Sequence, residues 1–470
     1  MVLIIVESVS VVLGGQSILS DIDLSIAPAD VLCVVGGSGS GKTSLARVLT
    51  GSLFHSGTVS FKGFNKEITV AYIPQEHQFR NLTNTSDFYY QQRFNASESD
   101  LSMKVCDFLA ADNSWIDVLR LRDIYDRPLL QLSNGENKRL QLAQRLQGAP
   151  DVLILDNPFL GLDVSGREIF EDVLKKLIDI GIQVILLAAS HRLPSIVTRV
   201  VYLDSGRIVF DGSPKDFALY DQQHLKAVES FDRSLMSSLS SIGQPSFEFA
   251  IAMRNVHIQY DSKVVLDGIN WEVLRGERWS LSGPNGAGKS SLLSLVTGDN
   301  PQAYANDIVL FDRKRGSGES IWDIKKNIGF VSPELHLYFD QGSTCYEVIA
   351  CGLFDTIGLF RVLSDSQKVL VDKWIDILHL RSCRNKPLRL MSRGEQRLSL
   401  LGRALIKMPA MLVLDEPCQG LDEQQTASFA SLIDVICAEF GTTLIYISHF
   451  VQDIPSCVTK FIRLENGRQV

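Results

Sequence analysis

The sequence predicts an α/β fold with a mainly parallel core sheet, present as two tandem domains in one chain. Short continuous apolar runs alternate with helical patterns, and a set of motifs recurs once in the same order along the chain. The 470 residues, at about 150 per domain, predict two to four domains. Hydrophobic residues make up 45% and charged residues 21% of the chain, so the composition predicts a folded, soluble protein.

The first half begins with strand, loop and helix patterns in that order. Residues 1–6 are apolar and are expected to form the first β-strand rather than a signal peptide, because they contain no basic residue and Glu7 follows directly. Val31–Val35 is a predicted strand that leads into a glycine-rich loop, and Ser44–Leu49 is a predicted helix. Two later apolar runs have the length of buried parallel strands: Val152–Leu155 and Val184–Leu187.

The motifs of the first half return in the second half. The recurring pairs are Gly36–Thr43 with Gly283–Ser290, Leu132–Glu136 with Met391–Glu395, Val152–Asp156 with Leu412–Asp415, and His191 with His449. This shared order indicates an internal repeat. We therefore predict one domain over residues 1–212, a second over residues 248–470, and a polar, Ser-rich linker over residues 213–247.

The first recurring motif is a glycine-rich loop between a strand and a helix. Such a loop directs backbone N–H groups and the helix N-terminus at phosphates, its lysine neutralises the β- and γ-phosphates, and the next hydroxyl binds Mg²⁺. We expect ATP and Mg²⁺ as ligands, with Thr43 and Ser290 on the metal. The predicted nucleotide-binding residues are Gly36, Gly37, Ser38, Gly39, Ser40, Gly41, Lys42 and Thr43, and Gly283, Pro284, Asn285, Gly286, Ala287, Gly288, Lys289 and Ser290.

An aspartate follows a buried strand in each half. A carboxylate at such a strand end suits a second contact to Mg²⁺, so Asp156 and Asp415 are predicted metal ligands. The next residue differs, because the first half has Asn157 and the second has Glu416. A carboxylate can accept a proton from an attacking water, whereas a neutral amide cannot. The second half is therefore predicted to hydrolyse ATP through Glu416, and the first half to hydrolyse it poorly.

On these motifs, each half resembles the ATPase domain of the ABC superfamily, and the resemblance covers nearly the whole chain. It implies that each half is a P-loop domain with a mainly parallel core sheet and a helical subdomain that carries a signature segment. The segments Ser133–Glu136 and Ser392–Glu395 match this signature. The resemblance implies nucleotide contacts by Ser133, Gly135, Ser392 and Gly394, a metal ligand in Gln75, and catalytic switch histidines in His191 and His449.

Domains of this family pair head to tail, and each nucleotide lies between the phosphate loop of one domain and the signature of the other. The resemblance therefore implies a monomer with two composite sites, one hydrolytic through Glu416 and one degenerate through Asn157.

Two departures from the family pattern make the halves unequal. Tyr260 lies where the family stacks an aromatic ring on adenine, whereas the first half has Leu13 there. The counterpart of Gln75 in the second half is Pro333. Three replacements for the missing glutamine stay open, namely Glu334, Ser332 or water.

Part of the second half resembles a narrower group of tandem ATPases that includes the molybdate-transport ATP-binding protein ModF and the photorepair protein PhrA. The matching segments are Leu293–Asp307, Gly316–Lys325 and Ile328–Ser332. Next to them, Arg313–Arg315 is expected to be a solvated basic loop, and Trp322 is expected in the core.

The composition limits the partners that the chain can have. No apolar run reaches the roughly 18 residues of a membrane helix, so a transport role would need a separate permease or another protein partner. The net charge of −8 disfavours nucleic acid as the main partner, and scattered cysteines predict reduced thiols. We expect a cytoplasmic location, with the mitochondrial matrix as the alternative. A transport-coupled ATPase, a slow ATP-gated switch and a ribosome or translation factor all remain open.

Overall fold

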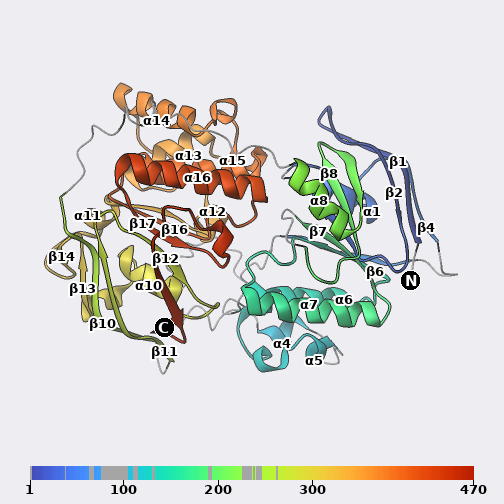
Figure 1. Ribbon diagram of the computed structural model, residues 1–470, viewed down its shortest axis with the longest axis horizontal. Coiled ribbons are helices and arrows are strands. Elements are labelled where there is room, and N and C mark those ends of the chain that lie inside the picture. Colours follow the sequence, from blue (N-terminus) through green and yellow to red (C-terminus); the bar gives the residue numbers. More distant parts are fainter. Residues whose placement is uncertain are drawn as a thin grey trace. The chain divides into compact units, whose positions relative to one another are not determined.

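The computed structural model describes residues 3–37, 39–62, 68–75, 104–109, 115–129, 132, 134–188, 193–224, 236, 239, 246–260 and 263–470. The chain divides into two compact units, Met1–Lys226 with Gly420–Glu423, and Ala227–Gln419 with Gln424–Val470. Each unit contains a six-stranded, mainly parallel sheet and a smaller antiparallel sheet (Figure 1). This architecture confirms the predicted α/β repeat.

The first unit is built on the strand order β5-β6-β7-β3-β8-β9, in which only β9 runs antiparallel to its neighbour. A separate antiparallel sheet has the order β2-β1-β4. The strands are β1 (Leu3–Leu13), β2 (Gln16–Ile26), β3 (Leu32–Val35), β4 (Ser56–Lys62), β5 (Val70–Ile73), β6 (Val152–Asp156), β7 (Gln183–Ala188), β8 (Arg199–Asp204) and β9 (Arg207–Gly212). The described helices are α1 (Lys42–Leu49), α4 (Val105–Phe108), α5 (Trp115–Val118), η1 (Arg122–Ile124), α6 (Asn134–Leu146), α7 (Val164–Asp179) and α8 (Pro214–His224).

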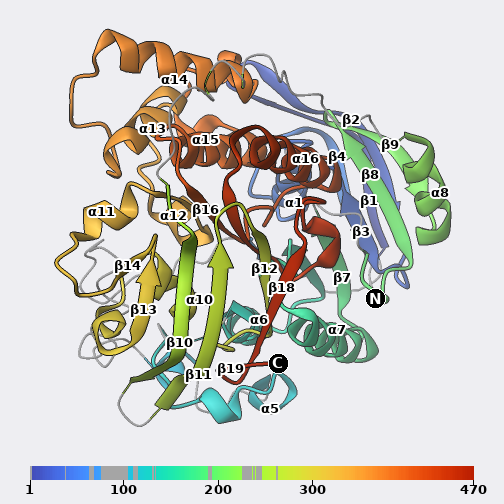
Figure 2. The ribbon, with the colours of Figure 1, turned by 60° about the vertical axis from the view of Figure 1, so that its left-hand side comes forward.

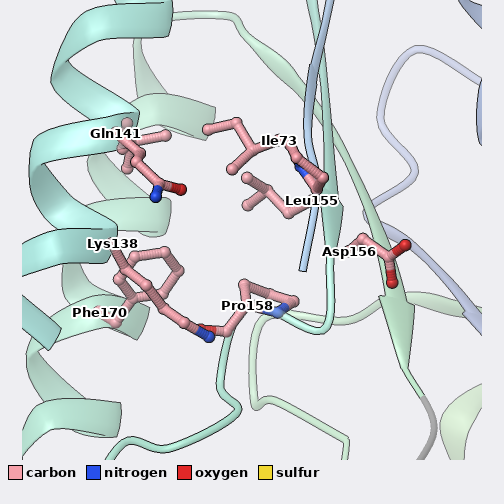
Figure 3. A pocket seen from close by; sticks show the side chains of 9 residues that line it. Ile73, Lys138, Gln141, Leu155, Asp156, Pro158 and Phe170 are labelled. Carbon is pink, nitrogen blue, oxygen red and sulfur yellow. The ribbon is translucent and has the colours of Figure 1, made fainter. Parts of the chain in front are cut away.

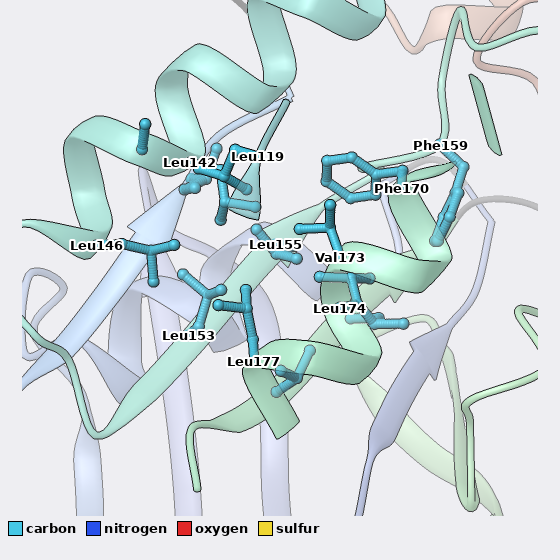
Figure 4. Packing of buried hydrophobic residues seen from close by; sticks show 14 of the residues in the cluster. Leu119, Leu142, Leu146, Leu153, Leu155, Phe159, Phe170, Val173, Leu174 and Leu177 are labelled. Atoms are coloured by element: carbon cyan, nitrogen blue, oxygen red, sulfur yellow. The ribbon is translucent and has the colours of Figure 1, made fainter. Parts of the chain in front are cut away.

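Both faces of strand β6 are covered, which explains its continuous apolar sequence. Leu153 and Leu155 belong to the cluster that helices α6 and α7 complete (Figure 4). The alternate residues Val152 and Ile154 belong to a second cluster, which contains Leu45 of α1. Because side chains alternate along a strand, a strand buried on both faces needs an apolar residue at every position. The strand predictions at 31–35, 152–155 and 184–187 and the helix prediction at 44–49 are confirmed.

The second unit repeats this arrangement with the order β15-β16-β17-β12-β18-β19 and a smaller sheet β11-β10-β13-β14. The strands are β10 (Phe249–Tyr260), β11 (Lys263–Leu274), β12 (Arg278–Ser282), β13 (Asp307–Leu310), β14 (Arg313–Lys314), β15 (Ile328–Val331), β16 (Met411–Asp415), β17 (Thr443–Ile447), β18 (Lys460–Glu465) and β19 (Arg468–Gln469). Figure 2 shows β10 and β11 side by side as a long antiparallel pair.

The helices of the second unit include a group, α13, α14 and α15, that packs together and corresponds to the helical subdomain (Figure 1). The helices are α10 (Lys289–Val296), η3 (Pro301–Ala305), α11 (Ile321–Lys325), α12 (Pro333–Tyr338), α13 (Cys345–Cys351), η4 (Gly352–Phe354), α14 (Asp365–Ile377), η5 (Arg381–Cys383), η6 (Leu388–Leu390), α15 (Arg393–Leu405), α16 (Glu423–Phe440) and η7 (Val451–Asp453).

Helix α8 lies within the segment 213–247 that the sequence analysis assigned to a linker. Its Phe217 is buried and packs against Tyr202 and Phe210 of the neighbouring strands β8 and β9. The first unit therefore continues beyond residue 212.

Two expectations for the second unit are corrected. Trp322 is 61% exposed, so its placement in the core was wrong. It lies on the five-residue helix α11, in which Ile324 is the buried residue. The basic segment is only partly solvated, because Arg313 and Lys314 are exposed while Arg315 is buried and pairs with Glu319 at 2.7 Å.

Among the residues that the structure describes, no helix has both the length and the apolar character needed to cross a membrane.

Candidate functional site

The glycine-rich loop of the first unit connects β3 to α1. Gly41, the residue before α1, has φ +105°, and a Cβ there would lie 2.6 Å from Cδ2 of Leu19. Only glycine combines this backbone conformation with such close packing. Within the same turn, Nζ of Lys42 donates to the carbonyl oxygens of Gly36 and Gly37 at 2.7 and 2.8 Å. The loop is thus folded around the lysine at the N-terminus of α1.

The loop between β12 and α10 in the second unit has the same geometry. Gly286 and Gly288 have φ values of +80° and +99°, beside +81° and +105° at the equivalent positions of the first unit. A Cβ on Gly283 would lie 2.2 Å from the carbonyl oxygen of Leu464. Nζ of Lys289 donates to the carbonyl oxygens of Gly283 and Pro284 at 2.6 and 2.9 Å. Both units therefore present a loop of the kind that binds phosphates.

Burial changes the acidity of the first lysine. It lowers the pKa of Lys42 to about 8, against the opposing effect of the Asp156 carboxylate. A bound polyphosphate would add negative charge beside this ammonium group and raise its pKa again.

The predicted metal ligands of the first unit meet at the ends of β5 and β6. Oδ2 of Asp156 accepts hydrogen bonds from Oγ1 of Thr43 at 2.9 Å and from the hydroxyl of Tyr72 at 3.0 Å. Nδ2 of Asn157 donates to Oδ1 of Asp156 at 3.1 Å and to Oε1 of Gln75 at 3.0 Å. A hydroxyl, a carboxylate and an amide oxygen are the hard ligands that Mg²⁺ prefers, but each of them already takes part in a hydrogen bond with another side chain of the first unit.

A small cavity lies on the other side of the Asp156 loop (Figure 3). Its volume is about 10 Å³, enough for about one water molecule. Lys138 of α6 lines it, and its Nζ donates to the carbonyl oxygens of Asn157 and Pro158 at 3.0 and 2.7 Å, while the Asp156 carboxylate points away. Burial lowers the pKa of Lys138 to about 7. This lysine ties the helix after the signature to the loop after β6.

The equivalent loop of the second unit carries the predicted catalytic pair. Glu416 has φ +48°, as Asn157 has +47°, and its backbone N–H donates to the carbonyl oxygen of Ile447 at 3.0 Å. Oε1 of Glu416 lies 3.1 Å from Nε2 of His449, and the two side chains are 17% and 10% exposed. Among the described residues this Oε1 makes no hydrogen bond of regular geometry. Burial, and next the Asp415 carboxylate, raise the pKa of Glu416 to about 8, against the lowering effect of Lys289.

In the second half Pro333 occupies the position of Gln75, and the structure shows what surrounds it. This residue is the first of helix α12, and the buried Ser332 caps the helix, with its Oγ accepting from the backbone N–H of Leu335 at 3.2 Å. Where the first unit has the Gln75 side chain, the second unit starts a helix.

Tyr260 and Leu13 also differ in their surroundings. The hydroxyl of Tyr260 accepts from Nδ2 of the buried Asn300 at 3.0 Å, which anchors the ring at the end of β10. Leu13 is exposed at the end of β1.

The signature serine of the second unit starts helix α15. Ser392 and Glu395 form a capping box, in which Oγ of Ser392 accepts from the backbone N–H of Glu395 and Oε2 of Glu395 accepts from that of Ser392. A Cβ on Gly394 would lie 3.1 Å from Nε2 of Gln425, so a larger residue there would require the Gln425 side chain to shift. In the first unit, Gly135 lies near the start of α6. Three predicted site residues lie outside the described residues, namely Ser38, Ser133 and His191.

Three further residues lie at these sites without having been predicted from the sequence: Tyr72, Lys138 and Arg397. Arg397 of α15 is buried, and its Nη2 donates to the carbonyl oxygen of Gln419 at 3.3 Å, so it resembles Lys138 in its role. Both follow the signature serine by the same number of residues. Aligning the two halves beyond their motifs would have revealed this pair of buried cations.

The protein family of this chain follows from a match to a known family. The sequence model of the family described as ABC transporter matches residues 19–160 and 266–419. The chain belongs to this family. Its two matched regions contain the two phosphate loops, so the chain is a tandem ABC ATPase that binds and hydrolyses ATP.

Two relatives within the ABC family match almost the whole chain. The ABC transporter ATP-binding protein ModF of Escherichia coli is 35% identical over 464 residues, which cover 93% of this chain and 91% of that protein. An uncharacterized ABC transporter ATP-binding protein of Schizosaccharomyces pombe is 28% identical over 480 residues and covers 96% of both chains. The similarity therefore extends over more than nine-tenths of this chain and of each relative.

Solved ABC structures share the fold. The archaeal ribosome recycling factor aABCE1, in complex with the ribosomal stalk protein aP1, has a TM-score of 0.59 at 17% identity, covering 98% of this chain and 88% of that chain. A model of ribosome-bound archaeal Pelota and ABCE1 gives a TM-score of 0.65 at 18% identity, covering 97% and 76%. At this identity the similarity concerns the fold alone.

Proposed function

We propose that both halves of this ABC ATPase bind ATP and that the second half alone hydrolyses it. The observation that carries the proposal is the pairing of Glu416 with His449 at the end of the central sheet of the second unit. The first half has Asn157 at the position of Glu416, and its amide hydrogen bonds to Asp156 and Gln75. The first half therefore acts as a holding site for nucleotide.

In the proposed reaction, Glu416 accepts the proton of the water that attacks the γ-phosphate. Among the described residues its Oε1 makes no hydrogen bond of regular geometry, and burial raises its pKa to about 8, which makes the carboxylate basic enough to take that proton. His449, 3.1 Å away, orients the carboxylate and can contact the γ-phosphate. Lys289 holds the β- and γ-phosphates, and Ser290 and Asp415 hold Mg²⁺. The metal, when bound, neutralises charge on the phosphates.

The proposal includes the head-to-tail pairing that the family resemblance implies. In that pairing, Ser392 and Gly394 complete the site of Lys42, and Ser133 and Gly135 complete the site of Lys289. ATP would then hold the halves closed, and hydrolysis through Glu416 would release them.

We propose a separate protein, such as a membrane permease, as the partner that this cycle moves. The name of the bacterial relative, an ABC transporter ATP-binding protein, supports a link to transport. The alternative is a slow ATP-gated switch or a ribosome-associated factor, which the neutral Asn157 site favours. A turnover rate near 10 s⁻¹, a typical kcat, would support an ATPase that moves a partner protein. A rate of about one to ten turnovers per hour would support the slow switch.

The unequal roles of the two halves can be tested by counting nucleotides. We expect each chain to bind two ATP molecules and to cleave one in a single turnover, because only one half has a proton acceptor. Radiolabelled ATP, trapped by rapid filtration and then separated into ATP and ADP, gives both numbers. Cleavage of both bound molecules would show that Asn157 does not disable the first half.

The rate of hydrolysis should depend on pH through Glu416. Its raised pKa of about 8 means that the carboxyl is mostly protonated at pH 7 and cannot accept a proton. The value of kcat/KM, measured at ATP concentrations well below KM, reports the protein before nucleotide binds and should therefore rise about tenfold per pH unit below the pKa and level off above it. A steady-state rate profile from pH 6 to about 9 measures this, and a flat profile would contradict the role of Glu416.

A further inference from the structure

Tyr72 contributes a hydrogen bond to the first half that the second half cannot make. Strands β5 and β6 pair in parallel with Tyr72 opposite Ile154, two residues before Asp156, and the tyrosine hydroxyl reaches Oδ2 of Asp156 at 3.0 Å. Strands β15 and β16 pair in the same register, with Phe330 opposite Val413, two residues before Asp415. The equivalent ring in the second half therefore has no hydroxyl to donate.

The Tyr72 hydroxyl is the donor in this hydrogen bond, because an ionised carboxylate can only accept. Oδ2 of Asp156 also accepts from Thr43, and Oδ1 accepts from Asn157. Three protein donors thus occupy both oxygens of this carboxylate.

The same set of hydrogen bonds occupies the other predicted metal ligand of the first half. Oε1 of Gln75 accepts from Nδ2 of Asn157 at 3.0 Å. Tyr72 and Asn157 donate hydrogen bonds to these oxygens. Phe330 and Glu416 stand at the equivalent positions of the second half. The halves therefore differ at the two positions that compete with a metal for the same oxygens.

We propose that Tyr72, together with Asn157, determines the metal requirement of the first half, so that it holds ATP with little dependence on Mg²⁺. Mg²⁺ keeps several of its waters in proteins, and these waters need acceptors on the surrounding carboxylates. In the first half Oδ2 of Asp156 already accepts two hydrogen bonds and Oδ1 accepts one, so fewer acceptor positions remain for those waters. The second half, with Phe330, depends on the metal. This inference rests on the proposed inequality of the two sites and gives it a physical cause.

The test uses the full chain and measures binding rather than hydrolysis. The affinity of each half for a fluorescent ATP analogue is measured with excess Mg²⁺ and with EDTA, in a Lys289→Ala background for the first half and a Lys42→Ala background for the second. We expect the two conditions to differ by less than about threefold in the first half and by more than about tenfold in the second, the size of one hydrogen bond to a charged group.

Tyr72→Phe and Phe330→Tyr are matched exchanges between the halves. Each changes one hydroxyl and keeps the ring. Tyr72→Phe should increase the metal dependence of the first half about tenfold, and Phe330→Tyr should decrease that of the second half. An unchanged ratio in both variants, with melting temperatures like that of the wild type, would overturn the proposal.

A second measurement needs no silenced site. Mn²⁺, counted by its electron paramagnetic resonance signal, should bind tightly at one site per ATP-loaded chain in the wild type and at two sites in Tyr72→Phe. Two tight sites in the wild type would contradict the inference. Because no hydrolysis is measured, this result does not depend on the role of Glu416, which is tested separately by the rate of hydrolysis.

Discussion

The substitution Glu416→Gln is expected to lower the rate of ATP hydrolysis by about 10²–10⁴-fold, the usual contribution of a positioned general base. Glutamine keeps the size and hydrogen-bonding shape of the side chain but cannot accept a proton from water. The contacts of Lys289 with its loop lie outside this change, so ATP binding should persist. Steady-state phosphate release measures the loss, and equilibrium binding of labelled ATP measures what remains.

A matched control makes the same glutamate-to-glutamine exchange at a position far from the proposed reaction. Glu272 is an exposed carboxylate on β11 of the same unit, 3.9 Å from Arg254, and Glu272→Gln should leave hydrolysis unchanged. If Glu416→Gln turned over ATP at the wild-type rate, another group would have to take the proton from water, and the assignment of the second half as the hydrolytic site would be wrong.

The parts of the fold that the sequence could predict depend on neighbours within a few residues. The glycine at position 41 must adopt φ +105° next to Leu19, and no other residue fits there. The loop can therefore be recognised in the sequence from its glycine. Asp156 and Asp415 follow continuous apolar strands, and their place at the carboxyl end of a parallel sheet follows directly. These short-range requirements made the two glycine-rich loops and the strands beside them predictable.

The contacts that distinguish the two sites depend on strand register across long stretches of chain. Tyr72 meets Asp156 only because β5 pairs with β6 in one particular register, about 80 residues further along the chain. A pattern of apolar residues predicts that two strands exist but does not fix which side chains come to lie opposite one another. The bond from Asn157 to Gln75 depends on the same register, whereas the bond from Lys138 to Pro158 depends on how helix α6 packs beside the loop after β6.

The two incorrect burial predictions in the second unit concern side chains that have both an apolar and a polar part. Trp322 was placed in the core on hydrophobicity alone, but on the short helix α11 the side chain of Ile324 fills the core and leaves the indole exposed. Arg315 shows the reverse, because Glu319 supplies a buried partner for its charge. A single residue's polarity does not determine burial when the partner lies in another part of the loop.

Replacing Lys289 with alanine is expected to weaken ATP binding by the second half about 10- to 100-fold, the range for the loss of hydrogen bonds between charged groups. Nζ of Lys289 lies 2.6 Å from the carbonyl oxygen of Gly283, at the N-terminus of α10, which is where phosphates would bind. Lys42 makes the same contacts in the first unit, and Lys42→Ala is therefore the matched variant.

Equilibrium binding should show one nucleotide lost in each variant. Steady-state hydrolysis should fall much further in Lys289→Ala, because only that half has Glu416 beside its loop. Equal losses of hydrolysis in the two variants would mean that the halves work as one obligatory unit, with nucleotide in the Asn157 half needed for each turnover.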